Sequence, residues 1–250
     1  SYPFITNRTP SGKVVIKTGT AAGGGENVHL TINGGDGTVD TYFENVNLSK
    51  EDFARSSYYK INAKREKEKA KFKSYESYLS SLKMKSDLKK FKKEDINRIA
   101  QLINKTNQFN LTVKRFTLEE VINISKNSNF LTIAGNLKDK FGDNGLVTVL
   151  IGKIEKQRID IISWLMSCRV FNRNLEFALF DYFVNLCRNR GISSINGYYN
   201  KTKKNFIVKD FYKTLGFKKI KSKKNEDKWE FKIEKKYVKK NRIIKIYSEK

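Results

Sequence analysis

The sequence predicts an α/β protein in which a mixed sheet is flanked by helices, and three observations carry this prediction. From residue 84 onward, β-type apolar runs and stretches of helical periodicity follow one another in the order βααβββαβαβ. A predicted strand at 161–167 leads through a short loop into a helix from residue 175, and a further strand at 192–199 completes a crossover. Residues typical of helix starts and helix ends occur at the boundaries of the helices in this order.

Each element after residue 84 has a local signal. Residues 93–105 place apolar side chains on one helical face, and Thr117–Glu120 form a capping box that opens the next helix. Gly142–Gly145 is predicted to be a turn, and Gly191 is predicted to end a long helix. The remaining strands are predicted at 84–91, 130–136, 146–154, 159–166, 192–199 and 228–234, and the remaining helices at 175–190 and 206–215.

The first 83 residues differ from the rest in composition. Lys13–Lys17 and Val28–Ile32 alternate apolar and polar residues between Gly-rich stretches, which predicts a small Gly-rich β segment over residues 1–40. Residues 41–83 are rich in Lys, Glu and Ala, and Ser49 and Ser74 are candidate N-caps, which predicts a charged helical connector. We therefore expect three parts, at 1–40, 41–83 and 84–250.

Composition limits the classes of function. The chain has 51 Lys and Arg residues against 26 Asp and Glu residues, a formal net charge of +25. Either solvated lysine faces or an anionic partner explains this excess, such as a nucleotide cofactor, an acidic carrier protein or nucleic acid. One histidine and two cysteines predict no metal site and no disulfide framework. Without an apolar run of about 20 residues or a signal-peptide pattern, we expect a cytoplasmic protein with no membrane partner.

The predicted functional centre is the crossover that ends at Leu175. Unpaired N–H groups and the positive end of a helix dipole favour a pyrophosphate there, and loop arginines add charge. The loop resembles the pyrophosphate loop of GNAT acyltransferases, Arg/Gln-x-x-Gly-x-Gly/Ala, with asparagine at both glycine positions. Asparagine tolerates positive φ, so the turn can survive. The resemblance implies binding of an acyl-CoA or a phosphopantetheine thioester by Arg169, Val170, Phe171, Asn172, Arg173 and Asn174.

A second motif follows downstream. Asn205–Tyr212, with Leu215–Phe217 after it, resembles the GNAT signature Asn-x-x-Ala-x-x-Phe-Tyr with Leu-Gly-Phe. The resemblance implies cofactor binding at Asn205 and protonation of the departing CoA thiolate by Tyr212. An aromatic core residue at Tyr212 is the other interpretation of the same pattern.

A more specific resemblance covers about Phe43 to Ile220. Asn104–Thr112, Phe141–Gly145 and Ser167–Val170 resemble the C-terminal half of FkbH-like proteins, which belong to subfamily IIIC of the haloacid-dehalogenase superfamily. These proteins load a glyceryl group from 1,3-bisphosphoglycerate onto an acyl carrier protein in polyketide biosynthesis. Their N-terminal half carries an Asp-x-Asp-x-Thr magnesium site, which this chain lacks. Residues that the resemblance places at the substrate are Asn104, Lys105, Thr106, Asn107, Gln108, Asn110 and Asp143. The string at 104–110 either lines a channel or satisfies loop backbone, and Asp143 is equally a turn former.

Cys168 is the candidate nucleophile. It follows a predicted strand, precedes a helix N-terminus and lies beside Arg169, and each feature favours a thiolate. A thiolate there could accept an acyl group and pass it to a phosphopantetheine thiol, whereas a buried, inert cysteine is the alternative. Cys187, inside a predicted helix, is expected to pack in the core.

Three functions remain open at this point. The first is an FkbH-like acyltransferase domain that acts with an acidic acyl carrier protein. The second is a CoA-dependent N-acetyltransferase. The third is a non-catalytic module that binds a carrier protein or nucleic acid.

Overall fold

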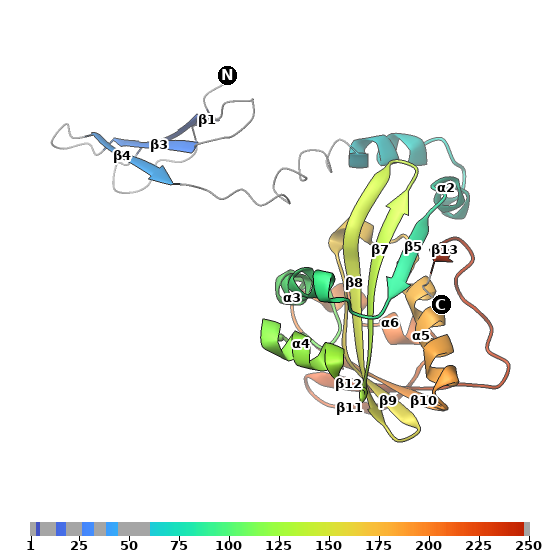
Figure 1. The fold of residues 1–250 in the computed structure, drawn as a ribbon. Coiled ribbons are helices and arrows are strands. Elements are labelled where there is room, and N and C mark those ends of the chain that lie inside the picture. The colour runs from blue at the N-terminus through green and yellow to red at the C-terminus, as the bar shows by residue number, and fades with distance from the viewer. Residues whose placement is uncertain (1–3, 6–13, 19–26, 33–38, 45–60, 248–250) are drawn as a thin grey trace. The chain divides into compact units, whose positions relative to one another are not determined.

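The computed structural model describes four strands within residues 4–44 and the continuous stretch 61–247 (Figure 1). The chain divides into two compact units, residues 1–62 and 63–250. The predicted divisions at residues 40 and 83 stay predictions.

The first unit contains an antiparallel sheet in the order β1-β2-β3-β4. Its strands are β1 (Phe4–Ile5), β2 (Val14–Thr18), β3 (Asn27–Ile32) and β4 (Val39–Glu44). The strands predicted at 13–17 and 28–32 are thereby confirmed. Residues 41–44, predicted to begin the helical connector, are part of β4, because alternation of β-branched and aromatic residues continues through them. The Gly-rich stretches at 19–25 and 34–37 and the candidate N-cap Ser49 lie outside the described residues.

In the second unit, residues 63–69 are helical, and α2 (Tyr75–Ser81) follows. The Ser74 hydroxyl accepts a hydrogen bond from the Ser77 N–H at 3.1 Å, which confirms the predicted N-cap. A three-residue turn, η1 (Lys93–Asp95), leads into α3 (Ile96–Lys105), and α4 (Leu118–Lys126) follows. Thr117 and Glu120 exchange both hydrogen bonds of the predicted capping box, at 3.1 and 2.7 Å.

One mixed sheet forms the centre of this unit, as the sequence predicts. Its strand order is β11-β12-β10-β9-β8-β7-β5-β13; β9 and β10 are parallel, and so are β5 and β13. The strands are β5 (Lys85–Lys89), β7 (Phe130–Asp139), β8 (Gly142–Glu155), β9 (Arg158–Met166), β10 (Ser194–Asn200), β11 (Lys218–Ser222), β12 (Glu226–Lys232) and β13 (Lys245–Tyr247), with β6 (Phe109–Asn110) paired to β9.

Helices cover both faces of the sheet (Figure 1). α3 and α4 bury Ile99, Ile103 and Val121 in a core on one face. α5 (Leu175–Asn189) buries Phe180 and Phe183 in a larger core on the other face, which α6 (Phe211–Thr214) joins. Among the described helices, none is long and apolar enough to cross a membrane.

Two predicted elements differ from the structure. Gly142–Gly145 is not the turn, because β7 and β8 are joined at Lys140–Phe141. There the Asp139 carboxylate accepts the Phe141 and Gly142 N–H groups at 2.9 and 3.1 Å, so the aspartate sets the turn. The predicted helix 206–215 is two short pieces, η3 (Phe206–Val208) and α6. The left-handed Gly191, at φ 68°, ends α5 as predicted.

Candidate functional site

The site lies where β9 and β10 separate. These parallel strands pair only at 158–160 and 194–196, near their first residues. Beyond that point each strand would present unpaired backbone groups to a gap. Ligands in α/β sheets bind outside the carboxyl ends of strands, so this gap is the natural place for a substrate.

A segment of the chain itself occupies this gap. β6 pairs with Leu165 and Met166 of β9, and the Leu111 N–H donates to the Trp164 carbonyl at 3.1 Å. On the other side, the Asn200 N–H donates to the Leu111 carbonyl at 2.8 Å. Residues 109–112 therefore link the two diverging strands, and the backbone of β9 at 164–166 is already paired there.

Asn205 locks this segment in place. Its fully buried side-chain amide donates to the carbonyls of Asn110 and Asn200, each at 2.9 Å. Its side-chain oxygen accepts from the N–H and the hydroxyl of Thr202, both at 2.9 Å. All these partners are protein groups, so Asn205 joins β10 to β6, and the cofactor role predicted for it stays a prediction.

The amide-rich string at 104–110 also bonds mainly within the protein. The Asn104 amide donates to the carbonyls of Ala100 and Phe116, and the Asn110 amide donates to that of Thr106. Arg115 donates to the Thr106 carbonyl and to the Asn107 side chain. The structure thus favours backbone satisfaction over a channel for these residues. Lys105 and Gln108 are exposed, and Asp143 forms an ion pair with Lys138 at 3.0 Å on the β7–β8 hairpin.

The loop between β9 and α5 keeps its predicted shape. It starts as η2 (Cys168–Val170), with the Ser167 hydroxyl accepting the Arg169 N–H at 3.4 Å. Asn172 and Asn174 adopt φ values of 59° and 62°, so both asparagines occupy the left-handed conformation that glycine would supply. Val170 is fully buried, which fixes the loop against the core.

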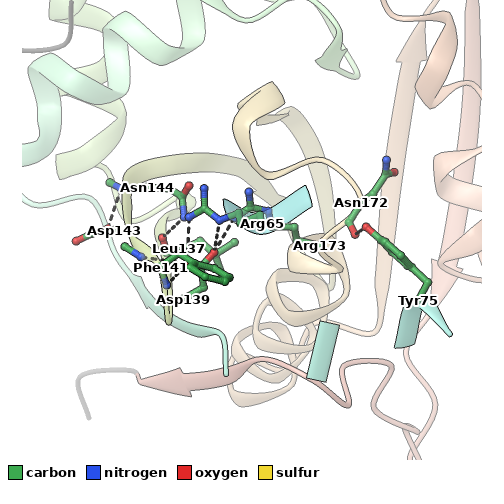
Figure 2. Close-up of polar contacts among 11 residues, drawn as sticks. Arg65, Tyr75, Leu137, Asp139, Phe141, Asp143, Asn144, Asn172 and Arg173 are labelled. Atoms are coloured by element: carbon green, nitrogen blue, oxygen red, sulfur yellow. Dashed lines mark hydrogen bonds and ion pairs between the residues drawn. The ribbon is translucent and has the colours of Figure 1, made fainter. Parts of the chain in front are cut away.

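Arg173 forms a buried ion pair with Asp139. Its guanidinium donates to the Asp139 carboxylate at 3.0 Å, and Arg65 donates to the same carboxylate at 2.9 and 3.0 Å (Figure 2). Asp139 has no exposed side-chain surface, and the two arginine side chains are at most 10% exposed. A buried ion pair therefore holds the Arg173 side chain, and its predicted place in a phosphate cradle stays a prediction.

Two further groups act on the same loop. The Tyr75 hydroxyl of α2 donates to the Asn172 carbonyl at 2.6 Å (Figure 2). Glu176 stands in the first turn of α5. Burial raises the pKa of its carboxyl above the ordinary value, and a hydrogen bond from its own backbone N–H offsets only part of this shift. One oxygen of that carboxyl is buried without a hydrogen-bond partner. A carboxyl at this helix start competes with a pyrophosphate for the same N–H groups.

Cys168 and Tyr212 have opposite surroundings. Cys168 is exposed at the end of β9, so it is accessible to a substrate. Tyr212 is 1% exposed, its ring packs against Gly197 and Trp164, and its hydroxyl makes no hydrogen bond of normal geometry. Burial raises the pKa of Tyr212 far above its ordinary value. Its position favours the core-aromatic interpretation over that of a proton donor. Cys187 is buried, and burial raises the pKa of its thiol to about 12, as expected for a packing residue.

The sequence analysis missed a polar cluster on the sheet. The Asp160 carboxylate accepts from Asn196 at 2.8 Å, from Tyr198 at 3.2 Å and from Arg158 at 3.1 Å. Burial, followed by the nearby Asp160 charge, raises the pKa of Tyr198 to about 12. A carboxylate alternating with Ile159 and Ile161 in a predicted strand was the available signal. No group of three or more metal-binding side chains occurs in the stretches that the structure describes.

No protein-family model matches the chain, and no curated protein matches it. Solved structures do align with it. The ribosomal-protein-S18-alanine N-acetyltransferase of Escherichia coli is 10% identical with a TM-score of 0.46, over 61% of this chain and 99% of that one. The PaiA N-acetyltransferase of Thermoplasma acidophilum, solved with coenzyme A, is 15% identical with a TM-score of 0.46, over 59% of this chain and 98% of that one. An acetyltransferase of the GNAT family from Staphylococcus aureus Mu50 is 14% identical with a TM-score of 0.46, over 60% of this chain and 99% of that one.

Proposed function

We propose that residues 63–250 are an acyltransferase domain that receives an acyl group on Cys168 and delivers it to the phosphopantetheine thiol of an acyl carrier protein. The observation that carries this proposal is the exposed Cys168 thiol on the loop between β9 and α5. Nucleophilic cysteines occupy accessible positions near helix N-termini and cationic side chains. Arg169 is the adjacent residue.

The chemistry needs two thioester exchanges. The Cys168 thiolate attacks the acyl carbonyl of a donor thioester; the bond from that carbonyl to the donor sulfur breaks, and the donor leaves as a thiolate that takes up the proton lost when Cys168 ionised. The carrier thiol then attacks the Cys168 thioester, and the Cys168 thiol is restored. Both steps conserve thioester bonds, so no oxidant or phosphate donor is required.

Two features favour a carrier-bound substrate over free CoA. Arg173 forms an ion pair with Asp139, and the Glu176 carboxyl stands at the start of α5. Both weaken the cradle that a CoA pyrophosphate needs.

Intact-mass spectrometry tests the proposal. The wild-type chain should gain one acyl mass from an acyl N-acetylcysteamine thioester, and Cys168→Ala should gain none. The Cys187→Ala variant is the matched control and should be acylated like the wild type, because Cys187 is buried. If Cys168→Ala gained the acyl mass in the same yield as the wild type, Cys168 would not be the nucleophile.

A CoA-dependent N-acetyltransferase is the second candidate. The left-handed Asn172 and Asn174 favour it, because the loop keeps the backbone conformation of a phosphate-binding turn. Binding of acetyl-CoA, measured by calorimetric titration, tests this candidate. Absence of heat up to millimolar acetyl-CoA rejects this candidate.

A non-catalytic module is the third candidate. The occupied gap and the buried hydroxyl of Tyr212 favour it, because both leave the fold without an open reaction centre. This candidate predicts binding of a carrier protein or nucleic acid with no adduct on Cys168.

A further inference from the structure

The segment after β10 exposes two large apolar side chains next to each other. Phe206 and Ile207 of η3 are 61% and 62% exposed, whereas Val208 of the same turn is 6% exposed. The turn buries one side chain and leaves two in solvent. Adjacent exposed apolar side chains that no core contact explains are typical of interaction sites.

Lysines surround this apolar pair. Five lysines and one aspartate occur between residues 201 and 213. Lys203 and Lys204 are exposed and form no ion pair with any residue that the structure describes. The Lys209 ammonium lies 4.4 Å from the centre of the Phe206 ring, so it stabilises this ring by a cation–π contact. We call Lys203, Lys204, Phe206, Ile207 and Lys209 the lysine–phenylalanine surface.

A cavity of about 810 Å³ adjoins this surface, and its lining includes Phe206, Lys209 and Asp227. The Asp227 carboxylate lies 3.2 Å from Lys201 and 3.0 Å from Lys219, which also line the cavity. Those two ammonium groups therefore share one carboxylate within the protein, which leaves a net charge of about +1 on the three side chains. Lys203, Lys204 and Lys209 remain available to form ion pairs with carboxylates of a partner.

The surface lies at the same sheet edge as Cys168. β9 and β10 are parallel, so the segments that follow them leave from one edge. The Phe109 ring contacts Phe171 of the Cys168 loop at 5.9 Å and Phe211 at the start of α6 at 4.9 Å between ring centres. One aromatic side chain thus bridges the two loops.

We propose that the lysine–phenylalanine surface is the docking site for an acidic protein, and that this protein is the acyl carrier protein of the proposed function, on which the inference rests. A concave, partly apolar surface ringed by lysines complements a protruding apolar side chain flanked by carboxylates. A polyanion fits it less well, because Asp210 and Asp227 line the cavity and one face of the Phe206 ring is covered by Lys209. Phe206 is the anchor, and the lysines set orientation and association rate.

Binding of a holo acyl carrier protein, measured by biolayer interferometry on the full chain at 0.1 M salt, tests the proposal. The variant Lys203→Glu/Lys204→Glu/Lys209→Glu should weaken binding at least tenfold, and Phe206→Ala should do so separately. The control Lys64→Glu/Lys67→Glu/Lys126→Glu changes the net charge equally, at exposed lysines on other helices. It should weaken binding less than threefold.

Several results overturn the docking site. They are absence of wild-type binding, equal loss in the two triple variants, or tighter wild-type binding to a mixed-sequence RNA or to phosphatidylglycerol vesicles than to the carrier protein. Acylation of Cys168 by an acyl N-acetylcysteamine thioester, followed by mass in the same variants, separates the two proposals. Acylation without selective carrier binding refutes the docking site alone, and selective binding without acylation refutes the transfer chemistry alone.

Discussion

Asp139→Asn should destabilise the second unit strongly. The substitution keeps an oxygen for the Phe141 and Gly142 N–H groups but removes the negative charge between Arg65 and Arg173. Two guanidinium groups would then stay buried without a counter-ion at Asp139. Removing one partner from a buried ion pair costs about 3–5 kcal/mol. We expect the free energy of unfolding to fall by that amount.

Urea unfolding followed by tryptophan fluorescence measures this change, because both tryptophans are buried in the second unit. With a slope of about 2 kcal/mol per molar urea, the midpoint should fall by roughly 1.5–2.5 M. Asp143→Asn is the matched control on the same hairpin. Its ion pair with Lys138 is about half exposed, so its loss should cost no more than about 1 kcal/mol. If Asp139→Asn unfolds within 1 kcal/mol of Asp143→Asn, the reasoning about the buried network is refuted.

Three further predictions follow from individual side chains. Gly197→Ala should lower the free energy of unfolding by about 1–3 kcal/mol, because the added Cβ would come within 3.0 Å of the Tyr212 ring; urea midpoints unchanged from the wild type would contradict this. Iodoacetamide at pH 8 should modify Cys168 rapidly and Cys187 only after unfolding, because Cys187 is buried and its pKa is raised to about 12; peptide mapping that finds equal modification would count against the structure. Burial alone would raise the pKa of Asp227, but hydrogen bonds from Ser222 and two lysines hold it below its ordinary value of 3.8. The stability gained over Asp227→Asn should therefore be present above that value and shrink as pH falls below it, and a gap between the two unfolding curves that stays constant from pH 6 to pH 2.5 would disprove this.

Elements with strong local signals were predictable from sequence. α5 has a long apolar helical pattern and a glycine stop, and the capping box at Thr117 is a short-range motif. The left-handed turns at Asn172 and Asn174 also follow from local preference, since asparagine adopts this conformation more readily than most residues. For these features, residues close together in the sequence determine the local structure.

Features that depend on distant partners were not predictable in the same way. Arg173 looks like a phosphate ligand because it is basic and precedes a helix, yet its partner Asp139 is 34 residues away. β6 has only two residues, so no periodicity marks it, and its place between β9 and β10 comes from tertiary pairing. The site differs from the expectation chiefly at these long-range contacts.

These contacts also bear on the proposed function. Asn172 and Asn174 are left-handed, while Arg173 and residues 109–112 make their bonds within the protein. An exposed thiol remains just after β9. These are the observations on which we base the proposal of chemistry at Cys168.

Transfer to a carrier protein tests the central proposal most directly. The chain is first acylated by an acyl N-acetylcysteamine thioester, freed of excess donor and mixed with a holo acyl carrier protein, and the mass of each protein is followed with time. The proposal predicts that the acyl mass leaves Cys168 and appears on the carrier, and that Cys168→Ala transfers nothing. A carrier that is acylated equally with wild type and with Cys168→Ala, or an acyl group that stays on the wild-type chain, would contradict it.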